Sequence, residues 1–249
     1  MRVAAIYDIH GNLPALDAVL QAIRPEDVDL IVVGGDVVPG PMPQETMARL
    51  LDLEVPTRFI HGNGDRVVLA HARGEPIDEV PARYRDSISW TANHLDRTTL
   101  RAMEAWPPSC TFEIDGLGDV LFCHATASND VDCFTRVTPE PRVTRLFAGV
   151  TAPTVVCGHT HMQFDRTIGT MRIVNAGSVG APFAPPRGAH WLLLGPDVQL
   201  RHTSYDVDRA AEQMRMTGFP LIEDVTIPYV VNPPPESESL AMFAPADAR

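Results

Sequence analysis

The chain has 249 residues and a formal net charge of −12, with 45% hydrophobic and 21% charged residues. This composition is typical of a folded globular protein and excludes a disordered or fibrous one. The acidic balance disfavours a nucleic-acid groove or an anionic membrane surface as a partner, because both would repel the chain. A substrate that carries phosphate would therefore need cations in its binding site.

The N-terminus gives an expectation of location. It reads MRVAAIYDIHG, with Asp8 and His10 where the apolar stretch of a signal peptide would continue. No hydrophobic run approaches the length of about 18 residues that a membrane-spanning helix needs. We therefore expect a cytoplasmic protein with no membrane partner.

Strand and helix patterns alternate in the first quarter of the chain. Residues 2–7 are β-favouring, and residues 13–23 follow with apolar side chains at helical spacing and Pro14 in the first turn. The same order is repeated by a strand over 30–33, a helix over 44–53 and a strand over 58–60. This alternation indicates an α/β sheet, whose functional groups gather where the strands end.

The second half is richer in strand. After a helical region over 81–106, which Pro107-Pro108 ends, we predict helices over 138–147 and 206–216 and strands over 110–114, 120–123, 154–157, 164–168, 171–174, 189–194 and 198–203. The last residues carry Pro-Pro-Pro, Glu and Ser, a composition that favours poor order. We expect one domain over 1–232 with a helical insertion at about 74–108, and a poorly ordered tail over 233–249.

Five polar motifs directly follow β-type runs: Asp8-Ile9-His10, Gly35-Asp36, Gly62-Asn63, His124 and Gly158-His159-Thr160-His161. In an extended segment residues i and i+2 face the same way, so Asp8 with His10, and His159 with His161, can each direct two ligands at one point. Two carboxylates, one amide oxygen and four imidazoles suit manganese, iron or zinc better than calcium. Because parallel strands end at a shared edge, we expect these seven side chains to be neighbours.

One of these motifs, and one further segment, can be interpreted differently. Taken alone, Gly62-Asn63-Gly64-Asp65 predicts a turn, because Asn and Gly tolerate left-handed backbone angles. The segment Ala176-Gly177-Ser178-Val179-Gly180 loosely matches the turn that carries a serine nucleophile. Ser178 comes late in the chain, however, with Asp197 and His202 soon after it, so serine hydrolysis is the weaker interpretation.

In this order the five motifs resemble the calcineurin-like metallophosphoesterase superfamily. The stretch Asp8-Ile9-His10-Gly11-Asn12, with Asn175-Ala176-Gly177-Ser178-Val179-Gly180, is most similar to its small bacterial and archaeal phosphodiesterase branch. The likeness covers residues 2–203. It implies an α/β fold in which two β-sheets form a sandwich flanked by helices, and it makes residues 1–232 a single metallophosphoesterase domain.

The resemblance also implies a site for two divalent or mixed-valence metal ions, with manganese preferred and iron or zinc as alternatives. One ion would be held by Asp8, His10 and His161, the other by Asn63, His124 and His159, with Asp36 bridging the two. The glycines beside Asn63 would let the backbone bring its amide oxygen to a cation.

Such a pair of ions suits phosphoester chemistry. Two divalent ions about 3.5–4 Å apart lower the pKa of a shared water and neutralise phosphate oxygens during in-line attack. The implied activity is hydrolysis of a phosphodiester or a nucleotide phosphoanhydride by a metal-bridging hydroxide, with Asp36 and Asn63 in the catalytic set. The alternative is a weakly active or inactive metal-binding interaction scaffold of the same fold. The implied partner is a small-molecule phosphoester or nucleotide. Cyclic nucleotides, dinucleoside polyphosphates and phosphomonoesters with good leaving groups all fit the activity.

The sequence departs from the superfamily pattern at Gly64, where many members have a His that protonates the leaving alkoxide. General acid catalysis typically contributes about 10² to 10⁴ in rate, so its loss favours leaving groups that are already stable. His61 is our candidate for a substitute catalytic group. Asn12 and Arg66 are our candidates for phosphate contacts.

Overall fold

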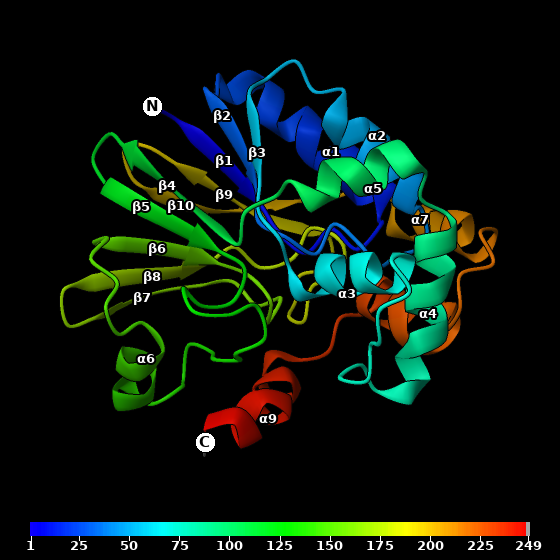
Figure 1. Cartoon of the computed structure of the whole chain (residues 1–249). Coiled ribbons are helices and arrows are strands. Elements are labelled where there is room, and N and C mark those ends of the chain that lie inside the picture. The colour runs from blue at the N-terminus through cyan, green and yellow to red at the C-terminus, as the bar shows by residue number, and fades with distance from the viewer. Residues whose placement is uncertain (248–249) are drawn as a thin grey trace.

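Two five-stranded sheets face each other in the computed structural model, which describes residues 1–247, and helices flank the pair (Figure 1). The first sheet has the order β10-β9-β1-β2-β3, with β1 (Val3–Ile6), β2 (Leu30–Val33), β3 (Thr57–Phe59), β9 (Ala189–Leu194) and β10 (Val198–Thr203). The second has the order β4-β5-β6-β8-β7, with β4 (Ser109–Ile114), β5 (Gly118–Cys123), β6 (Thr154–Cys157), β7 (Phe164–Ile168) and β8 (Met171–Asn175). The predicted two-sheet α/β sandwich is confirmed.

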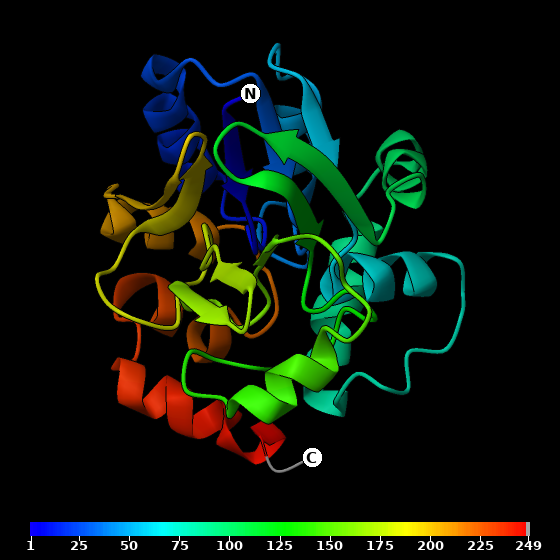
Figure 2. The ribbon, with the colours of Figure 1, turned by 90° about the vertical axis from the view of Figure 1, so that its left-hand side faces the viewer.

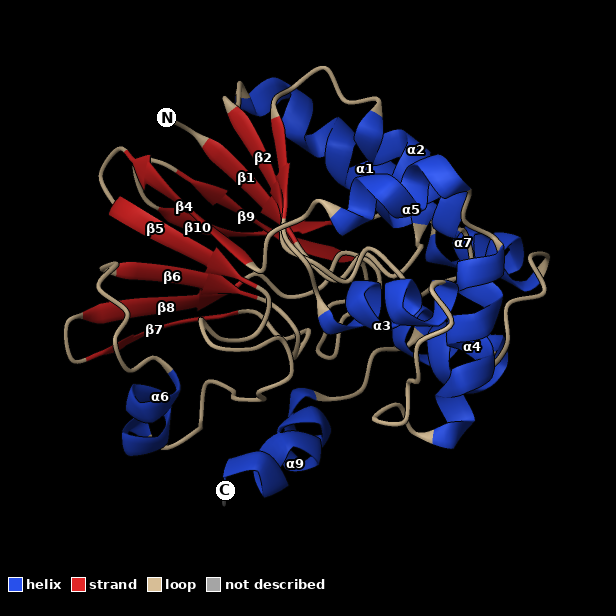
Figure 3. Ribbon diagram, viewed as in Figure 1, coloured by secondary structure: helices blue, strands red, loops and turns tan. Residues whose placement is uncertain are grey.

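The strand directions bring the functional loops together. In the first sheet β1, β2 and β3 are parallel, and β9 and β10 extend the sheet in antiparallel fashion. In the second sheet β5, β6 and β8 are parallel, and antiparallel β4 and β7 form its edges. Figure 3 shows the loops that follow the parallel strands of both sheets gathered at the centre of the molecule. One region therefore receives loops from two sheets, not from one.

Strand β1 shows why its sequence is apolar throughout. Val3 and Ala5 pack between the two sheets, whereas Ala4 and Ile6 pack against the helices on the other face of the first sheet. All four residues are buried. A strand that is covered on both faces loses the alternation of polar and apolar residues and becomes a continuous hydrophobic run.

The helices lie mostly on the outer face of the first sheet and at the central loops (Figure 1). They are α1 (Leu13–Ile23), α2 (Pro43–Leu51), α3 (Asn63–Ala72), α4 (Ala82–Asn93), α5 (Arg97–Glu104), α6 (Glu140–Leu146), α7 (Val207–Arg215), α8 (Ile227–Val231) and α9 (Glu236–Asp247), with a 3₁₀ turn over Arg24–Glu26 and a π-helix over Ile222–Thr226. Helices α4 and α5 occupy the segment that we predicted as a helical insertion. Within residues 1–247 no helix combines the length and apolarity needed to cross a bilayer.

The end of the chain differs from the prediction of a poorly ordered tail. Residues 236–247 form helix α9, drawn in red at the bottom of Figure 2, and residues 248 and 249 lie outside the described part of the chain. The Ser239 hydroxyl donates to the carbonyl of Phe183 at 2.6 Å, and Glu236 pairs with Arg136 at 2.6 Å. These contacts with the domain explain the helix, which composition alone did not predict.

The packing between the sheets gives a test of the fold. Phe122 lies on β5 and is completely buried between the sheets, so Phe122→Ala should lower the free energy of unfolding by about 3–5 kcal/mol. Leu200 on β10 is 45% exposed, and Leu200→Ala should change the stability by only about 0.5 kcal/mol. Denaturant unfolding of both variants measures the difference, and equal losses would contradict the described packing.

Candidate active site

All seven side chains that the sequence predicted as ligands lie where the loops of the two sheets meet. The first sheet contributes Asp8 and His10 after β1, Asp36 after β2 and Asn63 after β3, and the second sheet contributes His124 after β5 and His159 and His161 after β6. Five of the seven form two overlapping groups that share Asp8, and Asn63 and His159 both contact His124 in the second group.

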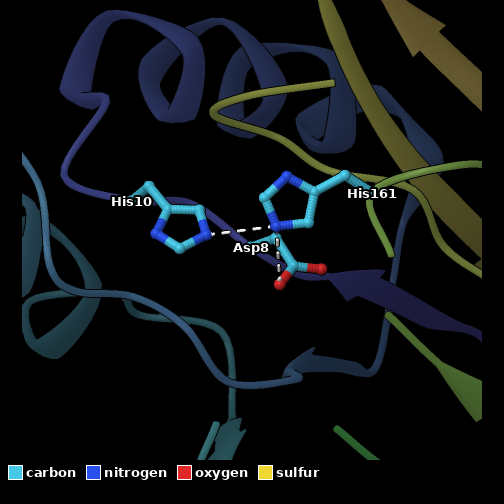
Figure 4. A group of neighbouring side chains, drawn as sticks. All are labelled: Asp8, His10 and His161. Carbon is cyan, nitrogen blue, oxygen red and sulfur yellow. Dashed lines mark hydrogen bonds and ion pairs between the residues drawn. The ribbon is translucent and has the colours of Figure 1, made fainter. Parts of the chain in front are cut away.

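The first group consists of Asp8, His10 and His161, whose ligand atoms all lie within 4.8 Å of one another (Figure 4). Nε2 of His10 is 3.2 Å from Nε2 of His161, and the latter atom is 3.4 Å from Oδ1 of Asp8. The Asp36 carboxylate adjoins this group, since its Oδ2 is 3.7 Å from Nε2 of His10. The three side chains in Figure 4 thus direct their ligand atoms at one point.

The second group consists of Asp8, Asp36 and His124, and so shares Asp8 with the first. Nε2 of His124 is 3.6 Å from Oδ1 of Asp36 and 3.9 Å from Oδ1 of Asp8. One end of the Asn63 amide lies 3.1 Å from that same His124 nitrogen and 3.0 Å from Nδ1 of His159. The two oxygens of Asp36 therefore face different groups of imidazoles, which is the position that a bridging ligand requires.

Backbone carbonyls fix which nitrogen of three histidines faces the centre. Nδ1 of His10, His124 and His161 lies 3.2, 3.0 and 2.6 Å from the carbonyls of Pro39, Gly34 and Ala181, respectively. A carbonyl oxygen can only accept, so each ring donates from Nδ1, and its Nε2 carries a lone pair when the ring is neutral. Metal-binding histidines are commonly oriented in this way.

The centre of the site consequently holds acceptors that face one another. The Nε2 lone pairs of His10 and His161 meet at 3.2 Å, and Oδ1 of Asp8 is buried with no hydrogen-bond partner in the described residues, whereas its Oδ2 accepts from the backbone N–H of His159. Buried acceptors without donors are costly unless a cation or a proton lies between them. The donor set therefore fits divalent metal ions of the manganese, iron and zinc type.

The pKa values of the candidate ligands reflect the negative charge of the two buried carboxylates. Burial lowers the pKa of His124 and His161, but the carboxylates of Asp36 and Asp8 outweigh it, and both pKa values are raised. Burial raises the pKa of Asp8, but the neighbouring imidazoles, His161 foremost, outweigh burial and hold this pKa well below its usual range. Burial, helped by His124, lowers the pKa of His159 to about 4, so this ring is neutral at neutral pH and keeps a lone pair.

The backbone at the ligands is left-handed, which corrects one expectation. We predicted that Asp8 with His10 and His159 with His161 would pair through extended geometry, but the φ values of these four residues are 53°, 49°, 65° and 58°. Asp36, at 50°, is the fifth. Such angles cost non-glycine residues of the order of 1 kcal/mol or more and persist only where the surrounding structure enforces them.

The glycines around Asn63 serve close approach, not a left-handed turn. Gly62 caps helix α3 with a φ of −100°, and Asn63 is the first residue of that helix. A Cβ atom on Gly62 would lie 2.1 Å from Oδ1 of Asp36, and one on Gly64 would lie 2.4 Å from the carbonyl of Val38. The predicted turn is thus the start of a helix. Because the two glycines have no side chains, the loop after β3 can pack closely against the loop after β2.

Asp65 holds this contact, and the sequence analysis assigned it no role. Its completely buried carboxylate accepts from the backbone N–H groups of Asp36 at 2.8 Å, Val38 at 3.1 Å and Gly62 at 3.0 Å. It therefore ties the loop that carries Asp36 to the helix that carries Asn63. The available signal was its position three residues after Gly62, where acidic residues commonly cap a helix.

Asn175 and Ser178 have structural roles in the loop next to the site. The Asn175 amide donates to the carbonyl of Gly158 at 2.6 Å and so fixes the loop that bears His159 and His161. The Ser178 hydroxyl is buried and donates to the carbonyl of Asp8 at 2.7 Å. A serine held in this way supports the strand end of β1 and has no free path to a substrate, which agrees with the weaker standing of serine hydrolysis.

The three remaining candidates make contacts outside the ligand cluster. Asn12 is 1% exposed, and its amide caps α1 at Ala15 and donates to Gly180 and Tyr205. Arg66 binds Asp130 with two nitrogens, at 2.7 and 3.2 Å.

His61 lies against Trp106, with ring centroids 5.7 Å apart, and burial lowers its pKa. A catalytic or substrate-binding role for Asn12, Arg66 or His61 would require each of them to exchange its present contacts. These three roles stay predictions from the sequence.

Comparison with known proteins defines the class. The model of the calcineurin-like phosphoesterase superfamily domain matches residues 1–194, and the chain belongs to this superfamily, as its motifs predicted. An uncharacterized protein of Methanocaldococcus jannaschii is 25% identical over 237 residues, which cover 88% of this chain and 93% of that protein.

Two solved structures agree with this assignment. A metallophosphoesterase from Sphaerobacter thermophilus is 25% identical and superposes with a TM-score of 0.70, covering 93% of this chain and 99% of that one. A hypothetical protein from Pyrococcus horikoshii OT3 superposes with a TM-score of 0.77, covering 92% and 97%. At 18% identity, the second similarity establishes the fold alone.

Replacing Asp65 should loosen the site without removing a ligand. In Asp65→Asn one of the three N–H groups would face an amide nitrogen, which should cost about 1–3 kcal/mol of stability. Affinity for Mn²⁺ should fall about 10- to 100-fold, as is typical when a group that orients metal ligands is lost. Calorimetric titration with Mn²⁺ and denaturant unfolding measure the two effects. Asp86→Asn on the exposed face of α4 is the matched control and should change neither.

Substitution of Gly64 tests the close approach of the two loops. Gly64→Ala should destabilise the protein by about 1–3 kcal/mol, because the new methyl group would overlap the Val38 carbonyl. Gly64→His, which introduces the superfamily's usual residue, should destabilise it further and should not accelerate turnover of substrates with poor leaving groups. Thermal unfolding and kinetics with such substrates check both statements, and a stable, faster Gly64→His variant would contradict them.

Proposed function

We propose that this protein is a divalent-metal-dependent phosphoesterase that hydrolyses a phosphodiester or a nucleotide phosphoanhydride. The observation that carries the proposal is the set of buried acceptors around Asp8, where two imidazole lone pairs and an unpartnered carboxylate oxygen meet. Membership of the calcineurin-like phosphoesterase superfamily supports the same conclusion. The same arrangement would also serve the metal-binding scaffold alternative, so turnover is the measurement that separates the two.

The residues divide naturally between two ions. Asp8, His10 and His161 would hold one, Asn63, His124 and His159 the other, and the two oxygens of Asp36 would contact both. Two divalent cations supply a water of lowered pKa and neutralise the charge on the phosphate oxygens. The mixture of nitrogen and oxygen ligands leads us to expect manganese, with iron or zinc as alternatives.

The chain's own groups keep the ligands ready and leave room for a substrate. The carbonyls of Pro39, Gly34 and Ala181 keep three imidazoles in one orientation, so binding requires no rotation of these rings. A pocket of about 370 Å³ opens directly onto His10, Asp36, Asn63, His159 and His161. A substrate phosphate can therefore reach the ligand cluster from the pocket side.

Loss of Asp36 should abolish turnover and weaken metal binding. In Asp36→Asn the bridging charge is gone, and hydrolysis of bis-(p-nitrophenyl) phosphate with Mn²⁺ should fall by more than about 100-fold, since even groups behind the ligands contribute 10- to 100-fold. Metal analysis of the purified protein should find bound metal in the parent chain and a lower content in the variant. Circular dichroism verifies that the variant is folded.

Control measurements separate the enzyme from the scaffold. Asp52→Asn replaces an exposed carboxylate at the end of α2 and should retain both metal content and activity. A parent protein that binds metal but releases no p-nitrophenolate would support the scaffold alternative. A parent protein without affinity for Mn²⁺, Fe²⁺ or Zn²⁺ would overturn the proposal.

A further inference from the structure

The pocket beside the ligand cluster has an apolar wall that the proposed chemistry does not explain. Its lining includes Ile88, Phe183, Phe219, Leu221, Val225 and Tyr229. Hydrolysis of a phosphate ester needs the cations, but it does not by itself need an aromatic wall next to them. The wall therefore provides information about the rest of the substrate.

Aromatic rings lead from a metal ligand into this wall. The Phe183 ring lies 4.4 Å from the His161 ring, and the Tyr229 ring stacks on Phe183 at 4.4 Å with an angle of 27° between the planes. Both side chains are half-buried, so their rings remain accessible from the pocket. An aromatic group bound against these rings would lie in the same pocket as a phosphate held by the proposed ligands.

Most of the wall comes from a segment outside the part of the chain that matches the superfamily. The match ends at residue 194, whereas Phe219, Leu221, Val225 and Tyr229 belong to the segment after α7. Leu221 has a φ of 61° and precedes a π-helix, two features that are rare in ordinary packing and frequent at functional sites. The Ser87 hydroxyl on α4 donates to the carbonyl of Pro220 at 3.3 Å and so joins the segment to the opposite wall.

The charges of the lining limit what the substrate can carry. Apart from the proposed metal ligands, no residue that lines this pocket within the described chain has a charged side chain. The guanidinium of Arg83 stacks on the Tyr84 ring at 4.5 Å but does not line the pocket. A second or third phosphate would find no cation there, so the lining fits a substrate with one phosphate and an uncharged remainder.

The titratable groups of the lining limit the leaving group. Besides the proposed ligands, they are the phenols of Tyr84 and Tyr229, and burial raises the pKa of Tyr229. A phenol with a high pKa is a poor proton donor at neutral pH. The leaving oxygen must therefore be stable as an anion, as it is when it is attached to an aromatic ring.

We propose that the preferred substrate is a phosphodiester with a single negative charge and an aromatic ester group, which binds against the pocket wall that Phe183, Tyr229 and Phe219 line. The inference rests on the proposed function. In the reaction, the oxygen of water bonds to phosphorus, the P–O bond to the aromatic group breaks, and its electron pair leaves on the aromatic oxygen. One proton of the water ends on the phosphomonoester product and the other on the aromatic hydroxyl compound.

Binding of two phosphonates tests the aromatic site without any turnover. With Mn²⁺ present, phenylphosphonate should bind about 10- to 100-fold more tightly than methylphosphonate in calorimetry, because burial of a ring is favourable by that amount. Phe183→Leu and Tyr229→Ala should each reduce this preference to less than about threefold, whereas Tyr229→Phe, which keeps the ring, should retain it. Met216→Ala, in the same segment but 87% exposed, is the control and should also retain it.

Kinetics gives the second readout. Phe183→Leu and Tyr229→Ala should raise the KM for methyl p-nitrophenyl phosphate about tenfold and change kcat less than about twofold. Diadenosine tetraphosphate, with four phosphates, should be hydrolysed with a lower kcat/KM than bis-(p-nitrophenyl) phosphate.

The two proposals can fail separately. Equal affinity for the two phosphonates, an unchanged preference in both wall variants, or better turnover of the polyphosphate would overturn the aromatic site while leaving the phosphoesterase intact. Conversely, a preference for phenylphosphonate in a protein that hydrolyses none of these esters would uphold the site and refute the proposed function.

Discussion

The site depends on one constraint: buried hydrogen-bond acceptors face one another where the loops of the two sheets meet. Lone pairs of His10 and His161 lie 3.2 Å apart, and the carboxylates of Asp8 and Asp36 adjoin them in a buried environment. Without a cation or a proton between the acceptors this arrangement is unfavourable, and the protein holds it by left-handed backbone, by carbonyls behind the imidazoles and by the carboxylate of Asp65. Much of the fold near the site can be understood as the support for this unfavourable cluster.

The architecture provides that support by placing rigid strands behind every ligand. Strand β1 is buried on both faces, and the loops after β1, β2 and β3 are tied to one another by backbone hydrogen bonds, such as those from Asp8 to Gly35 and from His10 to Asp36. The second sheet adds its ligands through the loop that Asn175 fixes. Each candidate ligand is therefore held by a loop that hydrogen bonds within the protein fix in place.

The sequence predicted all ten strands because apolar runs are local patterns. It also predicted that the seven candidate ligands would be neighbours, because five of these runs end in a polar motif. Helix α3 was missed because Gly62 and Gly64 indicate a turn, whereas a capping carboxylate from Asp65 and burial of Val67 and Val68 stabilise a helix.

The sequence could not predict the contacts that Asn12 and Arg66 make. Asn12 and Arg66 are near the ligands in sequence, but capping of α1 and pairing with Asp130 turn their polar groups elsewhere. Contacts of this kind depend on distant partners that no local pattern reveals. The segment after α7 was missed for the same reason, since its π-helix packs against α7 and α8 and the carbonyl of Pro220 accepts a hydrogen bond from Ser87 on α4.

The order of these parts along the chain separates two kinds of genetic change. Every proposed ligand lies at or before residue 161, whereas most of the apolar wall lies after residue 218. Mutations in the early part would decide whether the chemistry operates at all, and mutations in the late part would decide which molecules it reaches. Substrate specificity could therefore change during evolution through substitutions near the carboxyl end, while the residues proposed to carry out the hydrolysis stay the same.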